Sequence, residues 1–529
     1  MRDLEAQIAD ARQRLQLLPS DWPRLSALRS PDRPCFVCDR TGENVTFPET
    51  TRRIDAIAGS LVEELGLDQG DHLAIFGVDC HRYIELVLAC ARVGITVIPL
   101  NNRLADLELH NLLERGRARA LAVTREYHDR GKTALDAVGC VETLVDLDGS
   151  ELEHTPASVP AWARSGRQAP ERDVDPEDIF SISFTSGTTG RAKGVMQSHR
   201  MIRNMVNYMN VAYDVDDYDT EFRYSAAPLF HVAGIGMVLM GVARGFPSLI
   251  RAGFEPKETL RWMQDGELSA VFLVPTMISM LLELDEVAKD DYQQLRTILY
   301  GASPMPSSLL KRAQRTFGCD FVQAFGAGTE AGLQTALTAQ DHRRAAAGEE
   351  RLLDSIGKTS FGVDLRLVDE DLQDVPLGEV GEIATRSETV MSGYFEMPEE
   401  TAEALRDGWF RAGDLAWMDE EGYLYLCGRK KDMVIRGGEN IYPVEIETVL
   451  GSHPGVRECA VVGVPDEHWG ERVKAYVVVS DQGPTEDELR SHCRENLAKY
   501  KVPEMFEFVE DFPRNASGKI LKRELRLSE

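Results

Sequence analysis

The sequence predicts an α/β protein with a large N-terminal domain of α/β sheets and a small antiparallel β-barrel, followed by a small α+β C-terminal domain. Short apolar segments alternate with amphipathic ones through the N-terminal half, as in parallel sheets that helices cover on both faces. From residue 362 the apolar segments become short and closely spaced, which is typical of antiparallel strands. The length of 529 residues also requires several domains, because one domain usually holds about 50–250 residues.

The N-terminal region begins with apolar residues at helical spacing. Leu4, Ile8, Ala11 and Leu15 recur between charges of both signs, so residues 1–18 are predicted to form an amphipathic helix and not a signal peptide. A hairpin over 35–38 and 44–47 and a helix over 50–65 are expected next. Alternating strands and helices then follow over 71–77, 82–92, 96–99, 107–114, 120–123, 132–137 and 142–147. Residues 152–175, which contain several prolines, are predicted to form a loop.

Strands in the middle of the chain run into small residues. This holds for those predicted over 178–184, 297–300 and 320–325, and in α/β sheets ligands gather at the carboxyl ends of strands. A further strand over 270–274 ends at Pro275. The barrel strands are expected over 364–369, 381–385 and 415–427, the last as a hairpin that turns at 419–422.

The charged segment 429–432 is predicted to link two domains. The large domain would comprise residues 1–428 and the small one residues 433–529. Within the small domain we expect strands and helices over 443–450, 460–464, 475–479, 486–496 and 506–509.

Charge and composition exclude some classes of partner. The formal net charge of −28 argues against nucleic acid or an anionic membrane as a broad partner. The central apolar run over residues 232–243 is too short for a membrane span, which needs about 20 residues. The nine scattered cysteines argue against a disulfide framework and for a cytoplasmic protein, and Cys35 and Cys38 are interpreted as ordinary thiols. A homodimer is left open.

A glycine-rich segment at residues 185–194 is the first candidate binding site. It reads Thr-Ser-Gly-Thr-Thr-Gly-Arg-Ala-Lys-Gly and follows a predicted buried strand. Glycine lets backbone N–H groups converge on an anion, and the hydroxyls and Lys193 add donors. The segment is not a Walker loop, because Gly-x-x-x-x-Gly-Lys-[Ser/Thr] is absent. Taken alone, a surface turn is about as well supported as a phosphate-gripping loop.

The predicted hairpin at 415–427 supplies a second candidate. Its turn places Asp414 across from Cys427 or Gly428, and therefore close to Arg429. Such a pair could clamp a ribose diol, with the carboxylate accepting both hydroxyls. The alternative is a surface ion pair, which contributes little.

Two further candidates are a carboxylate and a lysine. Thr329-Glu330 follows the strand over 320–325, and Glu330 suits Mg²⁺, which takes one or two carboxylates together with phosphate oxygens. The alternative is a helix N-cap pair without a metal. Lys519 follows Gly518 and could neutralise an attacking carboxylate and an α-phosphate, or it could belong to a solvated basic helix start.

These segments, in this order, resemble the adenylate-forming superfamily, which includes acyl-CoA synthetases, luciferases and peptide-synthetase adenylation domains. The resemblance covers nearly the whole chain, from about residue 47 to residue 525. Each motif is weak by itself, but eight in sequence order are very specific. They lie at residues 185–194, 228–231, 300–304, 329–330, 409–414, 428–432, 437–443 and 518–519.

The resemblance implies a site for ATP, Mg²⁺ and coenzyme A. The catalytic residues would be Thr329 at the α-phosphate, Glu330 on Mg²⁺, Lys519 as the adenylation lysine and His231 at the acyl pocket, with Lys431 as the hinge. The glycine-rich loop would hold the β,γ-phosphates through Thr185, Ser186, Gly187, Thr188, Thr189, Gly190 and Lys193. The adenine wall would consist of Gly301, Ala302 and Ser303, and the ribose clamp of Asp414 and Arg429. The narrow wall of the pantetheine tunnel would consist of Gly437 and Gly438. The acyl pocket is implied to contain Phe230, His231, Ala233, Gly234 and Gly326.

Two positions depart from the family pattern. Ala192 stands where the family usually has a proline before the loop lysine. The segment Phe325-Gly-Ala-Gly-Thr-Glu330 is one residue longer than the usual aromatic-Gly-x-Thr-Glu, which bears on the acyl pocket floor and on the register of Thr329.

The implied function is a two-step ligase that forms an acyl-AMP and then an acyl-CoA thioester from a small carboxylic acid. His231 stands where peptide-synthetase domains place an Asp near the amino group, so an amino acid is not expected. The motif at residues 437–443 looks like medium- and long-chain acyl-CoA synthetases, which ranks a fatty acid first and an aryl or cinnamate-type acid second. The other hypotheses are a ligase that loads a carrier protein and a catalytically silent binding protein.

Overall fold

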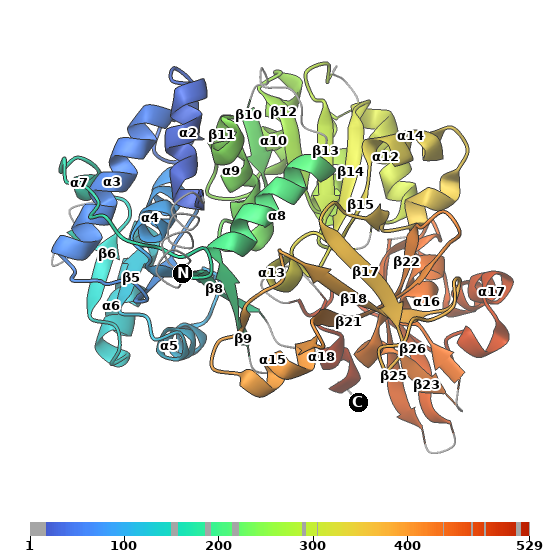
Figure 1. The fold of residues 1–529 in the computed structure, drawn as a ribbon. Helices are drawn as coiled ribbons and strands as arrows, with labels where there is room; N and C mark the ends of the chain where they lie inside the picture. The colour runs from blue at the N-terminus through green and yellow to red at the C-terminus, as the bar shows by residue number, and fades with distance from the viewer. Residues whose placement is uncertain are drawn as a thin grey trace, which may run out of the picture.

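The computed structural model describes residues 17–149, 157–185, 192–213, 222–287, 292–303, 305–436, 439–466, 469–480, 483–514 and 520–527. Two mixed sheets and a curled antiparallel half-barrel form the large domain, and a small α+β domain follows, which confirms the predicted fold class (Figure 1). The predicted helix over residues 1–18 lies almost wholly outside the described residues. None of the helices in the described part of the chain has the length and apolar character of a membrane span.

Nine strands form the first sheet, with a parallel centre and antiparallel edges. In spatial order they are β16 (Lys358–Thr359), β15 (Thr335–Leu337), β14 (Asp320–Phe325), β13 (Thr297–Gly301), β12 (Leu268–Leu273), β10 (Phe222–Ser225), β11 (Ser248–Ile250), β1 (Pro34–Cys38) and β2 (Glu43–Thr46).

Eight strands form the second sheet, which is parallel from β8 to β7 and antiparallel at β9 and β19. In spatial order they are β19 (Gly393–Tyr394), β9 (Lys193–Ser198), β8 (Ile179–Thr185), β4 (Thr96–Pro99), β3 (His72–Phe76), β5 (Ala120–Val123), β6 (Thr143–Asp146) and β7 (Ala157–Ser158).

A layer of helices packs between the two sheets. One apolar cluster contains residues of these helices together with Leu299 and Val322 of the first sheet and Val97 and Phe180 of the second. The two sheets therefore share one continuous core. The helices of this layer are α2 (Trp22–Arg29), α3 (Phe47–Glu63), α4 (His81–Arg92), α8 (His199–Ala212) and α9 (Val232–Arg244).

The outer face of each sheet is covered by helices as well. Helices α5 (Asp106–Arg115) and α6 (His128–Ala137) pack on the second sheet. The first sheet is covered by α10 (Pro256–Gln264), α11 (Pro275–Leu282), α12 (Ser307–Phe317) and α14 (Ala339–Ala346), which share a second apolar cluster with it. This arrangement follows from the alternation of strands and helices along the chain.

The half-barrel completes the large domain, and its last strand leads into the small one. Its strands are β17 (Val363–Val368), β18 (Gly381–Ser387), β21 (Trp409–Met418), β20 (Leu405–Arg406) and β22 (Leu424–Arg429), and α15 (Pro398–Ala404) precedes β20. The hairpin predicted over 415–427 is the β21–β22 pair.

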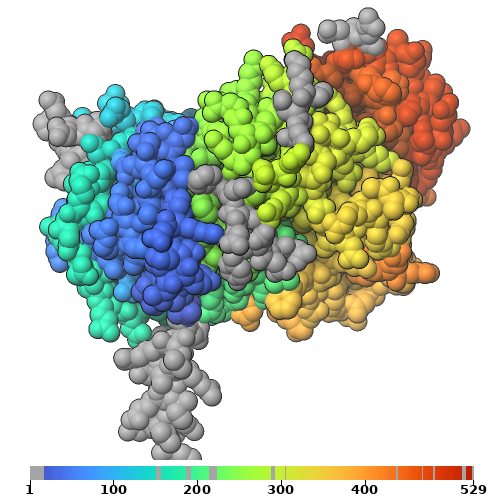
Figure 2. All heavy atoms as spheres, turned by 90° about the horizontal axis from the view of Figure 1, so that it is seen from above, coloured from blue at the N-terminus to red at the C-terminus, as the bar shows by residue number. Residues whose placement is uncertain are grey.

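The small domain contains one sheet with β24 (Glu439–Ile441), β23 (Val434–Arg436), β26 (Gly470–Val479), β25 (Val456–Asp466) and β27 (Met505–Phe508). Helices α16 (Pro443–Gly451) and α17 (Glu486–Asn496) share its apolar core, and α18 (Lys522–Leu527) packs against β25. Seen from above, this domain lies at the end of the molecule opposite the N-terminal helices (Figure 2).

The prediction of a loop over residues 152–175 was wrong in part. Strand β7 and helix α7 (Val159–Ala163) lie inside this range. Val159 and Trp162 are buried, and Pro160 occupies the first turn of α7, where its missing N–H costs nothing. Pro160 therefore starts a helix here instead of preventing one.

Candidate active site

Strands β8 and β9 bring the two ends of the glycine-rich loop together. Thr185 ends β8 and Lys193 begins β9, and the two residues are paired across the hairpin. The Thr185 hydroxyl donates to the Lys193 carbonyl oxygen at 3.4 Å. The contacts implied for the loop itself lie outside the described residues and stay predictions, which concerns Ser186, Gly187, Thr188, Thr189 and Gly190.

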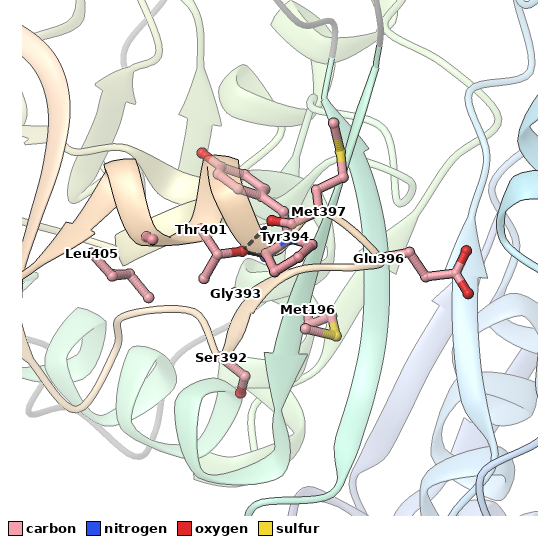
Figure 3. Close-up of a pocket in the computed structure, with 10 residues that line it drawn as sticks. Met196, Ser392, Gly393, Tyr394, Glu396, Met397, Thr401 and Leu405 are labelled. Atoms are coloured by element: carbon pink, nitrogen blue, oxygen red, sulfur yellow. Dashed lines mark hydrogen bonds between the residues drawn. The ribbon is translucent and has the colours of Figure 1, made fainter.

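The Lys193 ammonium group lies over the ring of Tyr394, with Nζ 4.6 Å from the ring centroid. Tyr394 belongs to β19, which pairs with β9, so both residues come from one sheet edge. The Thr401 hydroxyl accepts from the Tyr394 N–H at 2.9 Å and donates to the Met397 carbonyl at 2.7 Å. These two bonds fix the turn between β19 and α15, which lies beside an open pocket (Figure 3). Sequence analysis missed Tyr394, because its partner is about 200 residues away.

Thr329 and Glu330 lie in the short helix α13 (Gly328–Ala331), directly after β14. The N-cap of this helix is Ala327, so the two residues do not form an N-cap pair. Burial raises the pKa of Glu330 to about 7, although the charges of Arg429 and Lys193 act in the opposite direction. Glu330 is therefore within electrostatic reach of the loop lysine and of the half-barrel arginine.

The proposed adenine wall continues β13. Gly301 ends that strand, and a Cβ atom there would lie 2.4 Å from the Ala324 carbonyl oxygen of β14. Ala302 adopts a left-handed conformation with φ 68°, which is uncommon for a residue with a side chain. Ala302 and Ser303 are exposed at the carboxyl edge of the first sheet, where a planar ligand could approach the backbone.

Asp414 and Arg429 face each other directly, which corrects the predicted register of the hairpin. The sequence placed Asp414 across from Cys427 or Gly428, but Asp414 pairs with Arg429. The register shifts between Leu415 and Ala416, because Cys427 is an extra residue on β22 and forms a bulge. The Arg429 Nε donates to the Asp414 Oδ1 at 3.0 Å, and Asp414 is buried.

His231 caps the N-terminus of α9. Its Nδ1 accepts from the Ala233 N–H at 3.3 Å, so the proton of the neutral ring lies on Nε2. Burial lowers the pKa of His231, which keeps the ring neutral. The loop before it is held by Asp79, which accepts from the Leu229 N–H at 3.0 Å and which sequence analysis missed.

A small cavity of about 20 Å³, with room for about one water molecule, lies between α9 and the second sheet. Of the residues implied for the acyl pocket, Phe230 lines this cavity. The structure does not place the other implied residues on the cavity wall. Two of them, Gly234 and Gly326, are glycines at positions where neighbouring backbone leaves no room for a side chain. A Cβ at Gly234 would lie 2.1 Å from the Pro228 carbonyl oxygen, and one at Gly326 would lie 2.1 Å from that of Gly332. The lining residues are Val87, Val97, Pro99, Phe180, Ser181, Ser183, Gln197, Ile202, Phe230, Val232 and Ile235.

The segment proposed as the hinge forms a short 3₁₀ turn, Lys430–Asp432, after β22. Arg526 of α18 contacts it, with Nη1 3.5 Å from the Lys431 carbonyl oxygen and Nη2 3.2 Å from the Asp432 carboxylate. Lys519, Gly437 and Gly438 lie outside the described residues, so their roles stay predictions, as do the boundaries of the linker.

Comparison with known proteins extends this description to nearly the whole chain. The profile of the AMP-binding enzyme family matches residues 24–395, and that of the AMP-binding enzyme C-terminal domain matches residues 445–519. The chain is 37% identical over 507 residues to a feruloyl-CoA synthase from Amycolatopsis sp, covering 96% of this chain and 98% of that protein. It is 32% identical over 506 residues to the fatty acid–acyl-carrier-protein ligase ScoC from Streptomyces coeruleorubidus, covering 94% of each.

A solved structure shows the same fold. The amide bond synthetase McbA from Marinactinospora thermotolerans superposes with a TM-score of 0.86 at 29% sequence identity, over 96% of this chain and 99% of that one.

Proposed function

Because this chain belongs to the AMP-binding enzyme family of adenylate-forming enzymes and is an AMP-forming acid–thiol ligase, we propose that it joins a hydroxylated aromatic acid to coenzyme A through an acyl-AMP. The observation that carries the adenylation step is that the charges of Lys193, Arg429 and Asp414 all act on the buried Glu330 carboxyl group. These groups come from the glycine-rich loop, the half-barrel and the end of β14, which lie far apart in the sequence.

In the first half-reaction, an oxygen of the acid attacks the α-phosphorus of ATP, and the bond to the β-phosphate oxygen breaks to release pyrophosphate. Negative charge gathers on the α-phosphate, so cationic and N–H donors placed around it lower the barrier. We assign this role to the glycine-rich loop with Lys193 and to Lys519. Asp414 binds the ribose hydroxyls while Arg429 holds its carboxylate in place.

Glu330 is a suitable single protein ligand for Mg²⁺. The charge of Lys193 acts on its carboxyl group, and phosphate oxygens of the nucleotide would complete the coordination. Bound Mg²⁺ would supply further positive charge at the phosphates.

In the second half-reaction, the CoA thiolate attacks the acyl carbonyl carbon and AMP leaves with its phosphate oxygen. We propose that the small domain rotates about Lys431 between the two steps, so that Lys519 leaves and Gly437–Gly438 arrives. The contact of Arg526 with the Lys431 carbonyl would then have to change.

The similarity to a feruloyl-CoA synthase supports the aromatic acid. The cavity beside α9 has room for only about one water molecule, so it has to widen before it takes any acid. Phe230 and Ile235 form an apolar wall, and Ser181 and Gln197 form a polar wall whose groups already bond each other. The sequence alone ranked a fatty acid first, and we rank the aromatic acid first on the strength of the similarity.

A fatty acid remains the second candidate. The aliphatic residues Val87, Val97 and Ile202 line the cavity beside the polar wall, and the similarity to ScoC, whose name describes a fatty acid ligase, supports it. That name also keeps a carrier protein as an alternative acceptor of the acyl group.

A panel of acids separates these candidates. The purified protein is supplied with ATP, Mg²⁺ and CoA, and AMP release is followed with ferulate, coumarate, cinnamate, octanoate or palmitate. We expect the highest kcat/KM for the hydroxylated aromatic acids. Turnover confined to the fatty acids would overturn the substrate proposal, and replacement of CoA by a phosphopantetheinyl carrier protein tests the acceptor.

A further inference from the structure

The side-chain amide of Gln197 joins three parts of the active site. Gln197 lies in β9, and 2% of its surface is exposed. Its Oε1 accepts from the Ser181 hydroxyl at 2.8 Å and from the Ser183 hydroxyl at 3.0 Å, both in β8. Its Nε2 donates to the Thr329 carbonyl oxygen at 3.0 Å.

These contacts tie the phosphate loop to the segment that carries Glu330. Strands β8 and β9 flank the glycine-rich loop, and Ser181 and Gln197 are paired across them. Thr329 belongs to α13, which follows a strand of the other sheet. One buried amide therefore links two groups of phosphate-binding residues. Residues 391–392 form a second link, because the Met391 N–H donates to the Glu330 carbonyl at 2.7 Å and the Ser392 N–H donates to the Met196 carbonyl of β9 at 2.9 Å.

Gln197 also forms part of the cavity wall, together with Phe230 and Val232. The side chain that donates to the Thr329 carbonyl thus also faces this cavity. A buried amide with three satisfied hydrogen bonds is held firmly in one orientation.

We propose that Gln197 is a positioning residue for adenylation, which holds the Thr329–Glu330 segment in register with the strands of the glycine-rich loop. This inference depends on the proposed adenylation step and holds for either class of acid. Gln197 acts through Thr329 and needs no contact with the reacting atoms.

The substitution Gln197→Glu tests it with almost no change of shape. A carboxylate still accepts from Ser181 and Ser183, but it faces the Thr329 carbonyl with a second acceptor. The hydrogen bond is then lost and replaced by repulsion. We expect kcat for acid-dependent ATP–pyrophosphate exchange at pH 8 to fall at least tenfold. Thioester formation from supplied acyl-AMP should change by less than threefold, because acyl-AMP no longer carries the β,γ-phosphates that the glycine-rich loop and Glu330 with Mg²⁺ are assigned to bind.

A second buried glutamine provides the matched control. Gln334 is 1% exposed, accepts from the Ala327 N–H at 3.3 Å and donates to the Thr385 hydroxyl at 2.9 Å. In Gln334→Glu the carboxylate still accepts from Ala327, and the Thr385 hydroxyl can turn and donate. The same chemical change should therefore reduce acid-dependent ATP–pyrophosphate exchange less at Gln334 than at Gln197.

Hydrogen exchange supplies a readout that needs no activity. The Glu330 N–H donates to the Ala327 carbonyl at 2.7 Å, and its exchange reports whether α13 stays formed. In the free protein we expect this helix to exchange at least fivefold faster in Gln197→Glu than in the wild type. Unchanged exchange in α13 together with equal losses in both half-reactions would overturn the inference. If the wild-type protein shows no acid-dependent activity, the proposed function fails, and hydrogen exchange still decides the role of Gln197.

Discussion

Asp414 and Arg429 lie opposite each other on neighbouring strands of the half-barrel, with the guanidinium Nε 3.0 Å from the carboxylate. The bulge at Cys427 creates this pairing, and the buried position of Asp414 distinguishes it from an exposed ion pair. A carboxylate held this firmly is prepared to accept hydrogen bonds from a ribose.

Loss of this pair should weaken nucleotide binding. We expect Asp414→Asn to raise KM for ATP about tenfold or more. The substitution removes a charged acceptor, and a hydrogen bond to a charged group contributes about 1.5–3 kcal/mol. The matched control is Asp364→Asn, which breaks the exposed cross-strand pair with Arg386 in the same sheet. Equal effects of the two substitutions in steady-state kinetics would contradict the ribose assignment.

The ring of Tyr394 should matter more than its hydroxyl. Because Lys193 Nζ lies 4.6 Å from the ring centroid, Tyr394→Phe retains the cation–π contact and Tyr394→Leu removes it. A cation–π contact contributes about 0.5–2 kcal/mol, so we expect KM for ATP to rise about 2- to 30-fold in the Leu variant. The Phe variant should stay close to the wild type, and a similar loss in both would exclude the ring as the support of Lys193.

Asp79 should make stability depend on pH. Burial raises the pKa of Asp79 to about 7 from an ordinary value of 3.8, although the Leu229 N–H lowers it. The protonated form is thus favoured in the folded state, and its stabilising contribution is complete below about pH 4 and is lost as the pH rises through 7. Asn resembles the protonated form at every pH. Asp79→Asn should therefore raise Tm by about 2–5 °C at pH 8 and much less at pH 5.

Thermal unfolding of Asp79→Asn at the two pH values provides the check. The exposed Asp32→Asn serves as the control and should show no such difference. A Tm increase of the same size at pH 5 and pH 8 would show that a charge-independent effect is responsible.

A lysine of the linker and a lysine of the small domain should separate the half-reactions. We expect Lys519→Ala to abolish acid-dependent ATP–pyrophosphate exchange and to spare thioester formation from supplied acyl-AMP. Lys431→Pro should retain exchange and stall thioester formation, because proline restricts the rotation of the linker. Equal loss of both half-reactions in either variant would refute the assigned division of roles.

The fold could be predicted from the sequence because the alternation of strands and helices is a local pattern. Candidate residues could be named where a motif is local, as in Thr329-Glu330, and their roles stay predictions. The geometry of the candidate site could not be predicted where distant residues decide it. The bulge at Cys427 depends on how β21 and β22 pair, and the bond from Gln197 to Thr329 joins two sheets. A glutamine in a largely apolar strand indicates a structural hydrogen bond only once its burial is known.

The central claim is that an acyl-AMP forms before the thiol reacts. The most direct test is pyrophosphate exchange into ATP by the wild-type protein, with the preferred acid and Mg²⁺ present and CoA absent. The account predicts exchange that requires the acid and that disappears in Lys519→Ala. Exchange that requires CoA, or release of ADP and phosphate instead of AMP and pyrophosphate, would contradict it.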